Sequence, residues 1–201
     1  MTGASPMDGA GTDGAGLARV REPEPPGSMS GIWQDGLLAG LDPEGLATTY
    51  GTPAYVYDLD LAAARARLLR AALPARFDVA YAAKANPSLA VIAAVTRAGT
   101  GVDVASWGEL EAATRAGVAA SVTVVTGPGK SDALLRRAAG GGVRAVVVES
   151  LGELARLEAA AEAARAVVGV LFRLPAHEGQ TFGMSPEDAA AGARQARRSQ
   201  W

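Results

Sequence analysis

The sequence contains no cysteine and only one histidine, His177. The lack of cysteine excludes disulfides and thiolate metal sites, and one histidine cannot form a zinc site by itself. No apolar run approaches the roughly 18 residues that a membrane-spanning helix needs. The N-terminus also lacks the basic and apolar regions of a secretory signal. We therefore expect no metal site, no membrane insertion and a cytoplasmic location.

Lysine is scarce as well, because Lys84 and Lys130 are the only lysines among 19 Lys and Arg residues. The formal net charge is -2, and no long basic run occurs. Nucleic-acid binding requires clustered Lys and Arg to neutralise phosphates, so we expect no nucleic-acid partner. Lys84 stands inside an apolar stretch of this lysine-poor chain, which makes it a candidate for chemistry.

Apolar residues make up 49% of the 201 residues, which is enough for a sizeable core. Residues 1–30 differ from the rest because they are rich in Gly, Ala, Pro and Ser. The proline-rich run at 22–27 cannot hold a helix or a central strand. We predict a disordered tail over 1–30 and a single domain over 31–201.

Strand-prone and helix-prone segments alternate along this domain. We expect strands over 54–57, 77–83, 101–104, 122–125, 144–148 and 167–174. Helices are expected over 60–72, from Pro87 to Gly99, over 107–116, 131–139 and 151–165, and from Ser185 onward. Consecutive βα units with short connections predict an α/β fold with a parallel sheet.

Two architectures fit such a sheet, a doubly wound open sheet and a (β/α)8 barrel. A nucleotide-binding open sheet carries a Gly-rich fingerprint after its first strand. Here the run Lys84-Ala85-Asn86-Pro87 stands in that place, so the barrel is favoured. A complete barrel needs about 250 residues. We therefore predict a partial TIM-like barrel of about five βα units, without the C-terminal part of the barrel.

Lys84 follows the predicted strand 77–83, and the carboxyl ends of barrel strands hold the active site. We expect apolar neighbours to remove water from this lysine and to favour its neutral amine, which can form a Schiff base. Pyridoxal phosphate chemistry needs such an amine. The alternative is a lysine that extends its ammonium group into solvent.

Several segments resemble, in the same order, motifs of the fold-type III pyridoxal-phosphate-dependent decarboxylases that act on diaminopimelate, ornithine and arginine. These segments are Tyr50–Asp58, Tyr81–Pro87, Gly101–Leu110, Thr126–Asp132, Val148–Leu154 and Phe182–Met184. The resemblance covers residues 50 to about 190. It implies pyridoxal 5'-phosphate as the cofactor, an amino acid of the diaminopimelate or ornithine kind as the small-molecule substrate, decarboxylation as the reaction, and a homodimer as the family's assembly.

The resemblance also implies roles for single residues. Lys84 would bind the cofactor, Asp103 and Glu109 would lie close to it, and Arg173 would line the cofactor pocket. For Asp103 a capping or turn carboxylate is the alternative. For Glu109 the structural interpretation is favoured, because the helix dipole stabilises a carboxylate in a first turn. Arg173 leaves an apolar strand, so we expect it to have an anionic partner.

Other polar and apolar residues are interpreted structurally. Lys130 follows a Gly-Pro-Gly turn but lacks the spacing of a phosphate-binding loop, so we interpret it as a turn lysine. We expect His177 to be a solvated loop residue, and Phe182 and Met184 to be packing residues.

Later family motifs do not occur in this sequence: the histidine that stacks on the cofactor, the glycine-rich phosphate loop, the acid that pairs with the pyridine nitrogen, and the second β-domain. We therefore expect the chain to hold only the N-terminal portion of the barrel domain, and to be inactive alone. The alternatives are a non-catalytic partner or inactive fragment of a full-length decarboxylase, and a cofactor carrier or racemase-type barrel. The sequence leaves the substrate open.

Overall fold

The computed structural model describes residues 33–34, 36–177 and 179–199. It divides between Thr49 and Tyr50 into two compact units. The first contains the antiparallel strands β1 (Trp33–Gln34) and β2 (Leu37–Leu38) and all but the last residue of the helix α1 (Pro43–Tyr50). Asp42 begins α1, since its carboxylate accepts the Gly45 N–H at 2.9 Å. The predicted tail over 1–30 lies outside the described residues.

The second unit is built around one parallel sheet with the strand order β3-β4-β5-β6-β7. Its strands are β3 (Ala80–Ala82), β4 (Gly101–Val104), β5 (Thr123–Val125), β6 (Ala145–Val148) and β7 (Gly169–Phe172). Its α-helices are α2 (Leu59–Ala72), α3 (Leu89–Arg97), α4 (Trp107–Arg115), α5 (Asp132–Gly141), α6 (Leu151–Ala164) and α7 (Pro186–Ala196). Five βα units thus follow one another, which confirms the predicted partial barrel.

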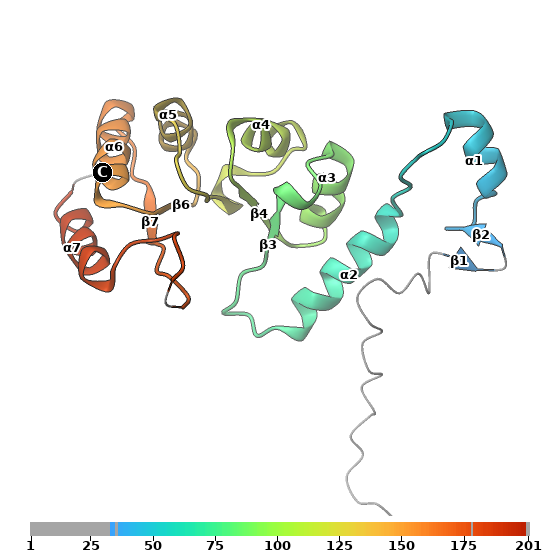
Figure 1. Cartoon of the computed structure of the whole chain (residues 1–201), viewed down its shortest axis with the longest axis horizontal. Helices are drawn as coiled ribbons and strands as arrows, with labels where there is room; N and C mark the ends of the chain where they lie inside the picture. Colours follow the sequence, from blue (N-terminus) through green and yellow to red (C-terminus); the bar gives the residue numbers. More distant parts are fainter. Residues whose placement is uncertain (1–32, 35, 178, 200–201) are drawn as a thin grey trace, which may run out of the picture. The chain divides into compact units, whose positions relative to one another are not determined.

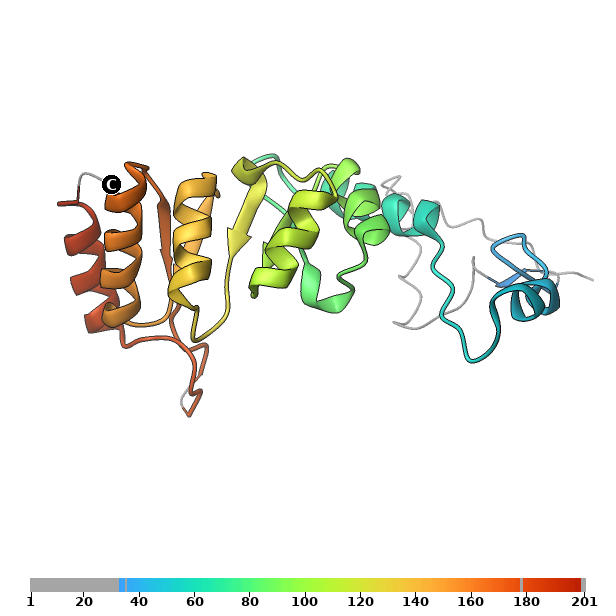
Figure 2. The same ribbon diagram turned by 90° about the horizontal axis from the view of Figure 1, so that it is seen from above.

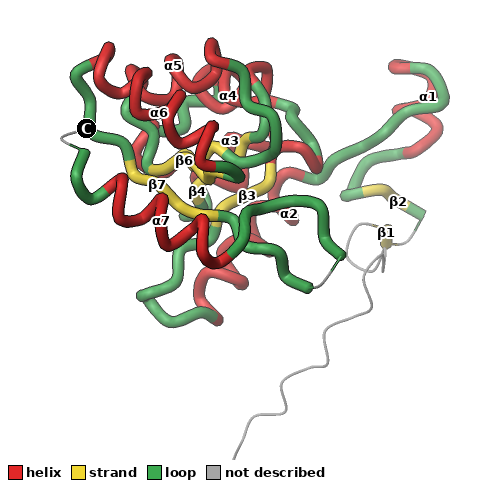
Figure 3. Tube along the Cα trace, turned by 60° about the vertical axis from the view of Figure 1, so that its left-hand side comes forward, coloured by secondary structure: helices red, strands yellow, loops and turns green. Residues whose placement is uncertain are grey.

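The helices of this unit form an arc around the outside of the strands (Figures 1 and 3). Seen from above, α5, α6 and α7 (gold, orange and red) lie side by side (Figure 2), and α6 packs against both neighbours. The strand side chains that point toward the helices form the core with the apolar faces of α3 to α6. The fully buried valines of the strands are Val102, Val104, Val125, Val146 and Val148.

The opposite face of the sheet carries the alternate residues of each strand. Ala82, Asp103 and Val124 lie in register on neighbouring strands, and all three are partly exposed. Val147 and Leu171 form the corresponding pair on β6 and β7. Leu171 is 51% exposed. The sheet therefore has one closed, helix-covered face and one face that is open among the described residues.

Serine caps begin four of the helices at the carboxyl ends of the strands. Their hydroxyl oxygens accept the backbone N–H three residues later, at 3.0 to 3.2 Å, and so satisfy donors that the first helical turn leaves unpaired. The caps are Ser106, Ser131, Ser150 and Ser185. The predicted caps Ser131 and Ser185 are confirmed.

One predicted strand is wrong. Residues 54–57 are β-prone but form no strand, and Tyr55 is 91% exposed. A strand is stabilised by its ladder partner, and no described segment pairs with this one. The expectation for Pro87 is also wrong, because α3 begins at Leu89 and Pro87 lies before its Ser88 N-cap. None of the described helices is long and apolar enough to cross a membrane.

Candidate functional site at the carboxyl ends of the strands

Lys84 lies in the short 3-10 helix η1 (Ala83–Ala85), directly after β3. The hydroxyl of Tyr81 donates to the carbonyl of Asn86 at 3.1 Å and holds this turn closed. Burial raises the pKa of the Tyr81 hydroxyl. The Tyr81 side chain therefore holds the turn that carries Lys84 in place.

The Lys84 side chain is exposed, and its ammonium group has no hydrogen bond or ion pair among the described residues. The expected removal of water from this lysine is thus wrong for the described structure. The strand β3 ends at Ala82, and the next residue, Ala83, is fully buried. Lys84 follows it and points away from the core. Its amine is available for reaction at the edge of the sheet.

Asp103 lies on the open face of β4, next to Ala82 of β3. Its Oδ1 accepts a hydrogen bond from the Thr126 hydroxyl at 2.5 Å. Asp103 does not cap α4, since Ser106 does so. The structure thereby brings Asp103 and Lys84 to the carboxyl ends of neighbouring strands.

Glu109 closes the turn between β4 and α4. Its Oε2 accepts the Ala105 N–H at 2.7 Å, while its own N–H is donated to Ser106 Oγ at 3.2 Å. These reciprocal hydrogen bonds resemble a capping box. The structural interpretation of Glu109 is confirmed, because its carboxylate satisfies a backbone donor.

Arg173 follows β7, the outer strand opposite β3. Its Nη1 donates to Glu149 Oε1 at 2.8 Å, which confirms the expected anionic partner. The guanidinium also lies over the Phe182 ring, 5.1 Å from its centre. Phe182 is therefore more than a packing residue, whereas Met184 is buried as predicted. His177 lies exposed in the same loop, as expected.

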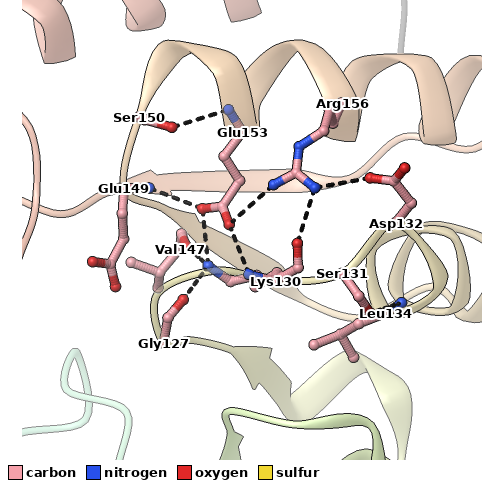
Figure 4. A network of polar contacts seen from close by, with 10 residues as sticks. All are labelled: Gly127, Lys130, Ser131, Asp132, Leu134, Val147, Glu149, Ser150, Glu153 and Arg156. Atoms are coloured by element: carbon pink, nitrogen blue, oxygen red, sulfur yellow. Dashed lines mark hydrogen bonds and ion pairs between the residues drawn. The ribbon is translucent and has the colours of Figure 1, made fainter.

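A buried ion pair between Lys130 and Glu153 was not found from the sequence (Figure 4). Lys130 Nζ lies 3.0 Å from Glu153 Oε2, and the two side chains are 0% and 4% exposed. Lys130 lies in the loop after the Gly-Pro-Gly turn, as predicted, but the burial of its side chain was not predicted. The partners are 23 positions apart in the sequence, and no local pattern connects them. Only the Ser150-x-x-Glu153 capping spacing marks Glu153 in advance.

The described residues include no group of three or more His, Asp or Glu side chains that could hold a metal ion. The donor set at the strand ends is instead an exposed primary amine, a partly buried carboxylate and an arginine. An amine can bond covalently to an aldehyde, and a nearby carboxylate and guanidinium can bind cationic and anionic groups.

Comparison with known proteins identifies this domain. Residues 59–200 match the family described as "Pyridoxal-dependent decarboxylase, pyridoxal binding domain". Diaminopimelate decarboxylase of Mycobacterium tuberculosis is 36% identical over 167 residues, which is 77% of this chain and 37% of that protein. The chain thus spans little more than a third of the length of this curated relative.

Solved structures agree with the family match. Diaminopimelate decarboxylase from Helicobacter pylori, complexed with L-lysine, is similar with a TM-score of 0.69 and 27% identity, over 78% of this chain and 43% of that one. SrLDC in complex with PLP and cadaverine gives a TM-score of 0.68 and 30% identity, over 78% and 39%. Pyridoxal phosphate is the cofactor of the matched family domain. The chain belongs to the pyridoxal-dependent decarboxylase family, and its described sheet lies within the family's pyridoxal-binding domain.

Proposed function

We propose that this chain binds pyridoxal 5'-phosphate through Lys84 and forms part of a decarboxylase for an amino acid. The observation that carries the proposal is the exposed amine of Lys84 at the carboxyl end of β3, beside Asp103 on β4. The chain has one other lysine, Lys130, and its ammonium group is already engaged. Lys84 is therefore the lysine that is open to an aldehyde.

The residues at the strand ends fit such a cofactor chemically. The Nζ of Lys84 would bond to its aldehyde carbon. The Asp103 carboxylate, which Thr126 orients, supplies negative charge on the neighbouring strand. The Arg173 guanidinium supplies positive charge at the other outer strand, where Glu149 and Phe182 hold it.

The bound cofactor supplies an electron sink for the electron pair that remains when carbon dioxide leaves. The contribution of the chain is to bind, to orient and to move protons. Lys84 Nζ, when free, can hold the proton that returns to the carbon from which the carboxylate has left. Asp103 could hold a cationic group at the carboxyl end of β4, since its carboxylate is only partly buried.

For the substrate we propose an amino acid with a second amino group, such as diaminopimelate or ornithine. The curated relatives that support this choice are diaminopimelate decarboxylases. Similar solved structures are complexes with L-lysine, putrescine and cadaverine, each of which carries two amino groups. A homodimer and a cytoplasmic location are part of the same proposal.

Borohydride trapping tests the proposal. The purified chain is mixed with pyridoxal phosphate, reduced with borohydride and mapped by peptide mass spectrometry, with Lys84→Ala as the matched variant. We expect the label on Lys84 in the wild type and no specific label in the variant. Equal labelling of Lys84, Lys130 and the N-terminal amine, or no labelling, would contradict a cofactor site at Lys84.

A further inference from the structure

Lys130 connects two consecutive βα turns through its buried ammonium group (Figure 4). Nζ donates to the Gly127 carbonyl at 2.6 Å within its own loop, and to the Val147 carbonyl at 2.5 Å on β6. It also pairs with Glu153 in the first turn of α6. All three ammonium donors therefore have an acceptor, so the group has one fixed position.

Glu153 extends this connection to Glu149, which also carries a charge. Its Oε2 accepts both the Lys130 ammonium and the Glu149 N–H, each at 3.0 Å, and its Oε1 accepts the Lys130 N–H at 3.3 Å. Glu149 in turn holds Arg173 through its own carboxylate. The chain of contacts runs without a break from the β5–α5 loop to the residue after β7.

The start of α6 does not require the lysine. Ser106 and Glu109 begin α4 with the same Ser-x-Gly-Glu pattern, and there the glutamate accepts only a backbone N–H. A buried ion pair is also weak support for stability, because removing two charges from water costs about as much as their attraction returns. Capping and stability therefore leave the presence of Lys130 unexplained. Its contacts with Gly127 and Val147, which have no equivalent at α4, tie Glu153 and the Glu149 N–H that it accepts to the β5–α5 loop and to β6.

We propose that Lys130 and Glu153 are positioning residues that act through Glu149 to fix the Arg173 guanidinium at the carboxyl end of the sheet. The purpose of this positioning rests on the proposed function, because a fixed cation is useful where an anionic cofactor binds. The contacts that carry it exist independently of the cofactor. Arg173 is the residue through which any effect on binding must pass.

The test variant is Lys130→Met with Glu153→Leu, which replaces both buried charges by apolar groups of similar length. Glu149→Gln removes the negative charge from the contact with Arg173 directly and serves as the positive control. Asp78→Asn with Arg144→Gln is the matched negative control, because this ion pair precedes β3 and β6 at the opposite ends of the strands. Lys130→Gln with Glu153→Gln, which removes both charges and keeps hydrogen-bonding groups at the two positions, replaces the Lys130→Met and Glu153→Leu variant should that fail to fold.

The first readout is the NMR signal of the Arg173 Nε–H group, assigned by its loss in Arg173→Lys. We expect the chemical shift of this signal in the Lys130/Glu153 variant to change to the value that it has in Glu149→Gln. In the negative control the chemical shift should stay at its wild-type value. A role limited to packing would leave the signal where it is in the wild type, and that result overturns the inference. This readout needs no cofactor.

The second readout is the dissociation constant for pyridoxal phosphate, followed by the absorbance of the bound cofactor. We expect roughly ten-fold weaker binding in the Lys130/Glu153 variant, a loss of the size seen for outer-shell partners at other sites. In an Arg173→Met background the same two changes should have no further effect. Additive losses contradict positioning through Arg173. If the wild type binds no cofactor, the proposed function fails, and the NMR signal alone decides the positioning inference.

Discussion

Thr126 donates its hydroxyl proton to Oδ1 of Asp103 at 2.5 Å, and its backbone N–H to the Val104 carbonyl at 2.8 Å. The two hydrogen bonds fix the end of β5 against the end of β4. Thr126→Val keeps the shape of the side chain but leaves the carboxylate without its donor. We expect the variant to lose about 1.5 kcal/mol in free energy of unfolding, measured in urea. Thr126→Ser, which keeps the hydroxyl, should lose less, and an equal loss in both variants would contradict the assigned role of this hydrogen bond.

Removal of one partner of the buried Lys130–Glu153 pair should be far more harmful than removal of both. Lys130→Met alone removes the nearer cation of the buried Glu153 carboxylate and leaves it Arg156 Nη2 at 3.9 Å, and we expect a loss of about 3 kcal/mol. The double variant with Glu153→Leu should unfold within about 1 kcal/mol of the wild type. Urea denaturation followed by circular dichroism measures both. A double variant as unstable as the single one would show that the pair is itself a large source of stability.

Gly101 begins β4 where the backbone of the neighbouring segment leaves no room for a side chain. A Cβ at this position would lie 2.4 Å from the carbonyl oxygen of Val122. We expect Gly101→Ala to cost about 1–3 kcal/mol in thermal or urea unfolding, because backbone atoms must shift. Gly108 in α4 has open space around it, so Gly108→Ala should be neutral or stabilising by up to about 1 kcal/mol. Similar losses in the two variants would exclude the steric explanation.

The Asp78–Arg144 ion pair predicts a change in protonation at low pH. The hydrogen bond from Arg144, together with its charge, holds the pKa of the Asp78 carboxyl below its usual value. A lowered folded-state pKa stabilises the fold above the unfolded value of about 3.9, and this contribution is lost as the pH falls through the folded pKa. Arg144→Gln should raise the pKa of Asp78 in a carboxyl NMR titration. An unchanged titration curve at low salt would contradict the pairing.

We expect the 201-residue chain to show little or no turnover by itself. The chain spans 37% of the length of the Mycobacterium tuberculosis relative, and we expect groups outside it to help hold the cofactor. The measurement is release of carbon dioxide from diaminopimelate and ornithine in the presence of pyridoxal phosphate. Release that depends on Lys84, tested with Lys84→Ala, would show that these groups are dispensable.

Much of the fold could be predicted from local sequence signals. Short runs of β-branched residues placed the strands of the sheet, and Ser131 and Ser185 marked helix starts correctly. These signals are local, since a cap involves residues only three positions apart. Residues 54–57 have the same β-prone composition, yet pairing depends on a partner that a local pattern does not reveal.

The site was predicted less completely for the same reason. Arg173 was expected to need an anion, and Glu149 is that anion, but only the fold brings the two together. The burial of Lys130 depends on contacts with β6 and α6, which lie 17 and 23 positions further along the chain. The exposure of Lys84 depends on which face of the sheet the helices cover. Residue types therefore indicated the chemistry, while tertiary contacts determined the partners.

The order of the strands in the sheet is the same as their order in the chain. Every ladder therefore joins segments that are close in sequence, and contact order within the sheet is low. Low contact order favours fast folding, because little chain entropy is lost before each new pairing forms. Each strand therefore pairs with the strand of the preceding βα unit, and no ladder has to wait for a distant part of the chain.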